Sequence, residues 1–248
     1  MSFARFFAPA AGVHGDRILL PVDEAEHLTR VLRLSTGDRV RVFNGRGAEF
    51  EAVIEAADRD GVRLTIGAPC TPAPEPRVAI TLAQAVLKGD KMDDVVRDAV
   101  MIGVAAIHPI VTARSETSIV ALARGRRRER WARIAVSSAK QCGRAVVPSI
   151  AEPRPFHDLG APPRADFPRP VLILVEPNTS AGLALADLEP AVPEHATLVV
   201  GPEGGWTAEE LQTATGLGTF VTLGRRTLRA DAMALVALSA MFARWGEF

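Results

Sequence analysis

Two strand–loop–helix units near the C-terminus constrain the fold of this chain more than any other feature. In the first, the apolar segment Thr197–Val200 runs into Gly201-Pro202-Glu203-Gly204-Gly205-Trp206, and in the second, Phe220–Leu223 runs into Gly224-Arg225-Arg226-Thr227-Leu228-Arg229. Ligands of open α/β sheets bind beyond the carboxyl ends of the strands. Two such loops side by side therefore predict one pocket. The alternative is a pair of tight turns without a ligand, for which one glycine in each would suffice.

The helix after the first loop has its own start signal. Thr207 with Glu210 three residues later is typical of a capping box, in which each residue bonds the backbone of the other. Farther back, Asp90–Ile102 has apolar residues at helical spacing and Gly103 as a stop, and Arg126–Cys142 predicts a second helix. A last helix is expected at Asp231–Trp245; the side chains that we expect it to bury are Met233, Val236, Ala237, Ala240 and Met241.

Strands are expected between these helices, at Val78–Ala83, Ala105–Val111 and Val171–Val175. The segment Pro148–Pro170 is rich in proline and is expected to be irregular. Strands that alternate with helices are typical of a mostly parallel sheet with helices on both faces, so the predicted class is α/β.

The N-terminal part has a different pattern. Arg39–Phe43 alternates with period two and meets Asn44-Gly45, which predicts a hairpin, and Asp60-Gly61 predicts another turn. Asp23 is the expected cap of a short helix. Short strands with tight turns favour a small β-barrel. The proline-rich segment 71–77 is the expected linker, which gives two domains, 1–72 and 73–248.

Composition excludes several classes of protein. The 248 residues are 48% hydrophobic and 23% charged, as in ordinary globular domains. We find no apolar run of the roughly 18–20 residues that span a bilayer and no signal-peptide pattern at the N-terminus. Two cysteines and five histidines without ligand spacing predict neither a disulfide framework nor a metal site. The expectation is a cytoplasmic protein without metal or membrane partner.

The net charge is zero, but its distribution is uneven. The segment from Arg114 to Arg144 contains nine basic residues and only Glu116 and Glu129 as acids, a local charge of +7. Such a cluster indicates a polyanionic partner. The alternative is a solvated helix face.

Common cofactor and nucleophile motifs are missing: Gly-x-Gly-x-x-Gly after a first strand, a P-loop and a Gly-x-Ser-x-Gly elbow. What remains is a glycine-rich cleft near Glu203 and Arg229. Main-chain N–H and C=O groups in such a cleft can satisfy the edges of an adenine.

Several motifs in order resemble one known family. They are Arg5-Phe6-Phe7, His27-Leu28-Thr29-Arg30-Val31-Leu32-Arg33, Lys88-Gly89-Asp90-Lys91-Met92-Asp93, Gln141-Cys142-Gly143-Arg144 and the two C-terminal loops. Together they resemble the RsmE family of the SPOUT superfamily, bacterial methyltransferases that act on N3 of a uridine in 16S ribosomal RNA of the small subunit. The resemblance implies a PUA-like RNA-binding barrel, a C-terminal domain with a trefoil knot, S-adenosylmethionine as methyl donor, and a homodimer.

The resemblance and the expected pocket together suggest roles for particular residues. Arg229 and Glu203 are the catalytic candidates, although Arg229 could instead bind a phosphate or cap a helix, and Glu203 could organise its own loop. No general base is identified. The expected cofactor pocket comprises Val175, Glu176, Val200, Gly201, Pro202, Gly204, Gly205, Leu223, Gly224, Leu228 and Arg229. The expected RNA contacts are Arg5, Arg30, Arg33, Lys88, Arg114 and Arg144.

The chain departs from the family pattern at three places. Ala230-Asp231-Ala232 stands where the family tends to have Thr-Glu-Thr, which removes two hydroxyls, and Asp231 is expected to cap the last helix. Met101 replaces a glutamate. Asp98 and Lys140 replace a lysine and a glutamate, which predicts one ion pair with exchanged charges. Two rival functions stay open: an RNA-binding or ribosome-associated module that has lost activity, and an adenine-nucleotide enzyme on an ordinary doubly wound sheet.

Overall fold

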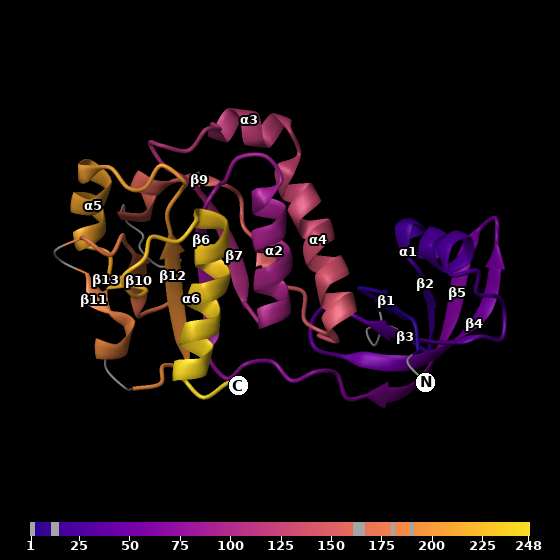
Figure 1. Cartoon of the computed structure of the whole chain (residues 1–248). Coiled ribbons are helices and arrows are strands. Elements are labelled where there is room, and N and C mark those ends of the chain that lie inside the picture. Colours follow the sequence, from indigo (N-terminus) through magenta and orange to yellow (C-terminus); the bar gives the residue numbers. More distant parts are fainter. Residues whose placement is uncertain (1–2, 11–14, 161–166, 180–181, 189–190) are drawn as a thin grey trace. The chain divides into compact units, whose positions relative to one another are not determined.

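The computed structural model describes residues 3–10, 15–160, 167–179, 182–188 and 191–248. Segment 161–166 of the expected irregular stretch lies outside the described residues. The chain forms two compact units (Figure 1): unit 1 comprises 1–75 with 136–147, and unit 2 comprises 76–135 with 148–248. The boundary at 72/73 stays a prediction, and no sequence pattern indicated that 136–147 belongs with the N-terminal unit.

Unit 1 is built on a five-stranded sheet. Its strands are β1 (Arg5–Phe7), β2 (Arg17–Leu19), β3 (Arg39–Phe43), β4 (Glu49–Asp58) and β5 (Gly61–Cys70), in the order β1-β3-β4-β5-β2. β1 runs parallel to β3, and the other neighbours are antiparallel. The predicted hairpin is confirmed, with a loop over 44–48 in which Asn44 Oδ1 accepts from the amides of Arg46 (2.8 Å) and Ala48 (3.2 Å).

The core of unit 1 follows the alternation in the sequence. Inward residues of neighbouring strands, which include the fully buried Phe6, Val42, Ile54 and Leu64, pack together and against the short helices α1 (Val22–Glu26) and η1 (His27–Val31). Leu28 of η1 is buried in the same core. The prediction for Asp23 is wrong: the N-cap of α1 is Pro21, and Asp23 lies in the first turn.

Unit 2 is a parallel sheet with helices. Its order is β11-β13-β10-β12-β6-β7-β8, and β9 also pairs with β7. The strands are β6 (Ala79–Ala85), β7 (Ala106–Val111), β8 (Ser149–Ile150), β9 (Arg154–Pro155), β10 (Val171–Leu174), β11 (Leu183–Ala184), β12 (His195–Val200) and β13 (Thr219–Thr222). Within the described residues, neighbouring strands of this sheet pair in parallel, so the predicted fold class is confirmed. The knot stays a prediction.

The helices of this fold are α2 (Lys91–Ile102), α3 (Ile119–Arg124), α4 (Arg127–Cys142), α5 (Ala208–Thr215) and α6 (Ala230–Arg244), with 3-10 turns η2 (Phe156–Gly160) and η4 (Leu185–Asp187). α2 and α6 lie side by side (Figure 1). Ala83 and Val199 share a core with Ala214 of α5. Successive strand residues point to opposite faces, so the residues beside them, Leu82 and Leu198, face the other side of the sheet.

Two expectations about the helices are wrong. Val236 of α6 is 41% exposed rather than buried. The N-cap of α6 is Arg229, and Asp231 lies inside the first turn. Asp98 accepts from Arg97 Nε at 2.8 Å within unit 2, and Lys140 donates to Glu24 at 2.7 Å within unit 1; the expected pair of Asp98 with Lys140 would join the two units and stays a prediction. The short helix α3 had no counterpart among the expected elements.

Candidate active site

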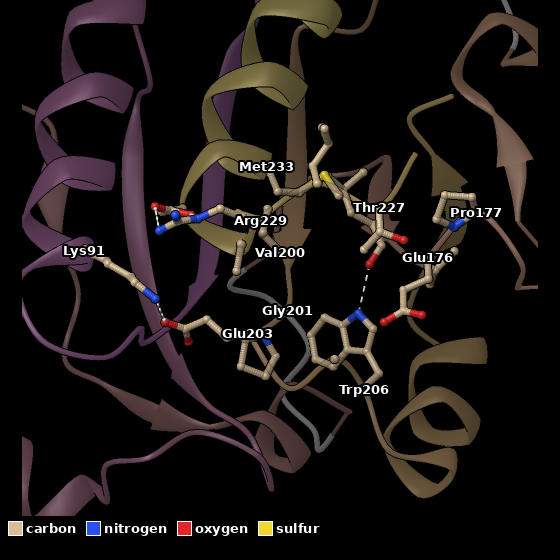
Figure 2. A pocket seen from close by; sticks show the side chains of 17 residues that line it. Lys91, Glu176, Pro177, Val200, Gly201, Glu203, Trp206, Thr227, Arg229 and Met233 are labelled. Carbon is tan, nitrogen blue, oxygen red and sulfur yellow. Dashed lines mark hydrogen bonds and ion pairs between the residues drawn. The ribbon is translucent and has the colours of Figure 1, made fainter. Parts of the chain in front are cut away.

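Both C-terminal loops line one cavity at the carboxyl edge of the unit 2 sheet, as predicted. The cavity measures about 350 Å³, within the range of small-molecule sites. Figure 2 shows its walls, which come from the ends of β10 and β12, from the loop after β13 and from the start of α6. Of the expected cofactor residues, those that line it are Val175, Glu176, Val200, Gly201, Pro202, Gly205, Leu228 and Arg229. Gly204, Leu223 and Gly224 are not among its lining residues.

Glycine is required where the first loop passes Trp206. A Cβ on Gly201 would lie 2.9 Å from Cε2 of the Trp206 ring, closer than real contacts allow. The indole Nε1 donates to the carbonyl of Leu174 at 2.8 Å, the bond drawn in Figure 2, and so fastens the ring across the end of β10. Gly205 has φ +68°, the left-handed region that favours glycine. The wall of this cavity, the slot, therefore combines a loop whose path depends on Gly201 and Gly205 with side chains such as Trp206 and Met233.

The capping box at the start of α5 is confirmed and has an additional function. Thr207 Oγ1 accepts from the Glu210 amide at 3.2 Å, and Glu210 Oε2 accepts from the Thr207 amide at 2.9 Å. The other carboxylate oxygen of Glu210 accepts from the amide of Ala113 at 2.7 Å. One buried side chain thus fixes both the helix start and the loop that follows β7.

Two ion pairs stand at the mouth of the cavity. Lys91 Nζ bonds Glu203 Oε1 at 2.8 Å, and the same oxygen accepts from the Lys88 amide at 3.3 Å. Arg229 holds Asp231 through two bonds, of 3.1 Å from Nε and 3.0 Å from a terminal nitrogen. Burial raises the pKa of Glu203, but the hydrogen bonds from Lys91 and from backbone amides outweigh it, and the net pKa is lowered. The pKa of Asp231 is lowered in the same way, against burial, by its bonds from Arg229 and the backbone.

Sequence reasoning missed Lys91 as a residue of this cavity. Lys91 is the first residue of α2, and α2 follows the carboxyl end of β6, which pairs with β12. The rule that predicted the pocket, that loops after neighbouring parallel strands meet, applies equally to this loop and would have found it.

Two of the expected RNA contacts are structural residues of unit 1. Arg5 is 13% exposed; it bonds both oxygens of the buried Glu49, at 3.0 and 2.9 Å, and the carbonyls of residues 139, 140, 143 and 144. Arg144 is 5% exposed and bonds Glu75, with Nε to Oε1 at 3.0 Å. Neither guanidinium is open to a phosphate.

The other four expected RNA contacts are exposed. Arg30 forms a surface pair with Glu26 at 3.1 Å, and Arg33 has φ 56°. Lys88 pairs with Glu116 at 3.0 Å. Arg114 lies over Gly204 and donates to its carbonyl at 2.7 Å, which puts it beside the loop that walls the cavity. Gly204 thus supports Arg114 instead of lining the slot.

The sequence cluster of basic residues is partly neutralised within unit 2. Arg128 pairs with Glu152 at 2.8 Å, and Arg130 pairs with Asp90 and Asp93 of the loop before α2 and its first turn. The arginines on and between α3 and α4 that have no carboxylate partner in the described part of the chain are Arg124, Arg126, Arg127 and Arg133. Arg127 donates to the carbonyl of Gly89 at 3.0 Å, which joins these arginines to the Lys88–Lys91 loop.

Metal and membrane features are not found among the described residues. No group of three or more histidine, cysteine or acidic side chains there could hold a metal ion. None of the helices in the described ranges is both long and apolar enough to cross a bilayer.

The fold and the cavity define a two-part protein: a β-rich unit and a parallel α/β unit with a slot beyond the carboxyl ends of its strands. Residues 74–242 match the protein-family model of the RNA methyltransferase domain. Residues 20–67 match the protein-family model of the RNA methyltransferase PUA domain. The chain belongs to the RNA methyltransferase family. This membership removes the alternative of an adenine-nucleotide enzyme on an ordinary doubly wound sheet.

Individual proteins are similar to this chain over most of its length. Ribosomal RNA small subunit methyltransferase E of Bacillus subtilis is 27% identical over 223 residues, 88% of this chain and 87% of that protein. The protein of the same name from Neisseria gonorrhoeae, solved with S-adenosylmethionine, is 29% identical with a TM-score of 0.86, and 98% of each chain is covered. A Legionella pneumophila protein described as a methyltransferase, also solved with S-adenosylmethionine, is 29% identical with a TM-score of 0.88 at the same coverage.

Proposed function

We propose that this chain transfers a methyl group from S-adenosylmethionine to N3 of a uridine in 16S ribosomal RNA. The observation that carries the proposal is the slot itself: two glycine-bearing loops line one cavity of small-molecule size, and ion pairs at its mouth supply charge for a reacting base. The likeness to small subunit methyltransferase E supports the choice of substrate.

The slot fits the proposed donor. Gly201 has no room for a Cβ against Trp206, and a Cβ on Gly205 would lie 3.0 Å from Glu176 Oε1, so glycine at both positions lets Trp206 and Glu176 pack against the loop that lines the slot. S-adenosylmethionine, when bound, supplies a methyl sulfonium as the electrophile. The loop of Gly201–Trp206 would hold the adenosine, and the charged mouth would orient the uracil for attack in line. No residue of the pocket is assigned as the base that takes the N3 proton.

The proposed RNA substrate suits the exposed cations of both units. In unit 1 these are Arg30 and Arg33, and in unit 2 they are Lys88, Arg114, Arg124, Arg126 and Arg133. Phosphate neutralisation supplies most of the non-specific affinity for RNA and makes that affinity fall with salt. We expect Arg124→Gln with Arg133→Gln to weaken RNA binding and to reduce the salt slope by about 0.7 for each phosphate of single-stranded RNA that is no longer neutralised.

A homodimer is part of the proposal. The sequence of α6 is apolar nearly all round, and Val236 on it and Met101 on the neighbouring α2 are 41% and 39% exposed. A second copy of the chain would cover them. Analytical ultracentrifugation should give a mass of two chains for the wild type. The variant Val236→Asp should sediment with the mass of a single chain. Because ribosomal RNA is the proposed substrate, we infer a cytoplasmic protein.

The test uses 16S RNA from a strain that lacks this methylation. The purified chain with S-adenosylmethionine should create N3-methyluridine, identified by mass spectrometry of digested nucleosides, and RNA already methylated at that site serves as the control.

A second candidate function is an RNA-binding module without activity, because Ala230 and Asp231, which line the slot, stand where the resemblance implies Thr and Glu. Donor and RNA binding without any methylated nucleoside would favour this second function.

A further inference from the structure

Two cations reach the mouth of the cavity, and they differ in how much water surrounds them. The Lys91 side chain is 35% exposed and its partner Glu203 34%, whereas the Arg229 side chain is 74% exposed. An electrostatic interaction weakens as the effective dielectric constant around it rises. For the same distance to a developing charge, the half-buried ammonium of Lys91 is therefore the stronger stabiliser. Figure 2 shows both side chains beside the cavity.

We propose that Lys91 is the catalytic cation of this site: its ammonium stabilises the negative charge that builds on a uracil carbonyl oxygen when N3 loses its proton. Glu203 is then a positioning residue that aims Lys91, and Arg229 is not the principal stabiliser. This inference rests on the proposed function and deepens it, since it assigns the group that acts on the base.

The step balances without a further reagent. The N3 proton leaves to solvent, and the negative charge is shared between N3 and the two carbonyl oxygens of the uracil. N3 then attacks the methyl carbon, so that an N–C bond forms as the S–C bond breaks and its electron pair stays with sulfur. Lys91 keeps its proton throughout and acts only by hydrogen bond and charge.

The contacts of Glu203 suit a positioning role. Its Oε1 accepts hydrogen bonds from Lys91 Nζ at 2.8 Å and from the Lys88 amide at 3.3 Å. The carboxylate is therefore held by the loop before α2 as well as by the lysine. An ammonium has three N–H donors, and Glu203 uses one of them, which leaves two for an incoming carbonyl. Glu203 itself is ionised at neutral pH, since its pKa is lowered, and so has no proton to give.

The experiment compares Lys91→Met and Lys91→Arg with the matched control Arg97→Met. Arg97 lies on the same helix and also pairs with carboxylates, Asp94 at 2.7 Å and Asp98 at 2.8 Å, but it does not line the cavity. Single-turnover methylation of the unmethylated 16S RNA is measured from pH 7 to pH 10, and the affinity for S-adenosylmethionine is measured by calorimetry. Circular dichroism checks that each variant is folded.

We expect Lys91→Met to lower the single-turnover rate at pH 7 by about 10²- to 10³-fold, the loss typical of one oxyanion-stabilising donor. Donor affinity should stay within about twofold of the wild type. The deficit should shrink as the pH rises, because hydroxide then removes the N3 proton without help from a cation. Lys91→Arg should keep part of the rate, since it keeps the charge, and Arg97→Met should match the wild type.

Three outcomes would overturn the inference. If Lys91→Met lost affinity for S-adenosylmethionine by the same factor as it lost rate, the role of Lys91 would be to bind S-adenosylmethionine. A deficit that is the same at every pH would make its role structural. Alkaline recovery in Arg229→Met but not in Lys91→Met would return the role to Arg229. The wild type alone tests the proposed function, by whether it forms N3-methyluridine, and the variants relative to an active wild type test this inference, so the two failures are distinct.

Discussion

Replacing Arg5 tests whether this residue belongs to the scaffold of unit 1 rather than to an RNA-binding surface. The change Arg5→Met keeps much of the aliphatic volume and removes the guanidinium. Glu49, whose side chain is 2% exposed, would then lack a partner that bonds both of its oxygens. The carbonyls of residues 139, 140, 143 and 144 would lack their donor as well.

The expected magnitude follows from burial. Breaking a buried ion pair by removing one partner costs about 3–5 kcal/mol, because a charge is left uncompensated. The same change at an exposed pair costs about 0–1 kcal/mol. Arg17 and Glu55 form such a pair in the same unit, at 3.1 Å with side chains 70% and 35% exposed, so Arg17→Met is the matched control.

The assay must report on unit 1 alone. The three tryptophans, Trp131, Trp206 and Trp245, all belong to unit 2 and cannot report on unit 1. Hydrogen exchange of peptides from β3 and β4, followed by mass spectrometry, does so. A loss of about 3–5 kcal/mol should speed exchange there by roughly 10²- to 10⁴-fold, since each 1.4 kcal/mol is about a factor of ten.

A double variant and an RNA-binding measurement complete the test. Arg5→Met with Glu49→Met should be less destabilised than Arg5→Met alone, because no buried charge is stranded. Normal exchange in Arg5→Met together with weaker RNA binding would refute the reasoning. Arg5 would then be the RNA contact that the sequence suggested.

Three further predictions concern unit 2. Gly218→Ala would bring a Cβ into collision with the carbonyl oxygen of Val171, so tryptophan fluorescence in denaturant should reveal a loss of stability of about 1–3 kcal/mol. An unchanged denaturation midpoint would contradict the close packing. Gly201→Ala would displace the Trp206 ring and weaken its hydrogen bond to Leu174, which contributes about 1 kcal/mol. Calorimetry should therefore give roughly fivefold weaker binding of S-adenosylmethionine. Equal affinity would argue against the slot as the binding site. The folded pKa of Glu203 is lowered, so its ion pair stabilises the fold above the ordinary value of 4.5 and is lost as the pH falls through the folded pKa. The difference in melting temperature between wild type and Glu203→Gln should therefore be constant near neutral pH and vanish in acid, and a difference that persisted in acid would contradict the pair.

The elements that the sequence predicted correctly depend on neighbours along the chain. The hairpin of β3 and β4 and the capping box of Thr207 with Glu210 are both present. The same holds for the stop at Gly103, whose φ of 118° few other residues adopt. Even the shared cavity followed from local signals, because parallel strands bring their carboxyl ends to one edge whatever the rest of the chain does.

The fate of charged side chains could not be predicted in that way. Arg5 and Arg144 have the residue type of an RNA contact, but their partners Glu49 and Glu75 are 44 and 69 residues away in the sequence. Val236 has the spacing of a core residue and is exposed, because helical period does not say how wide the covered stripe of a helix is.

The sequence by itself thus determined most of the secondary structure, the parallel sheet and the edge at which a ligand would bind, since these depend on periodicity and on turn chemistry. Only the tertiary structure decided which cations are buried in ion pairs, which remain on the surface, and that Lys91 enters the pocket. The reason is that the energy of a charge depends on the water and the counter-charges around it, and distant parts of the chain supply both.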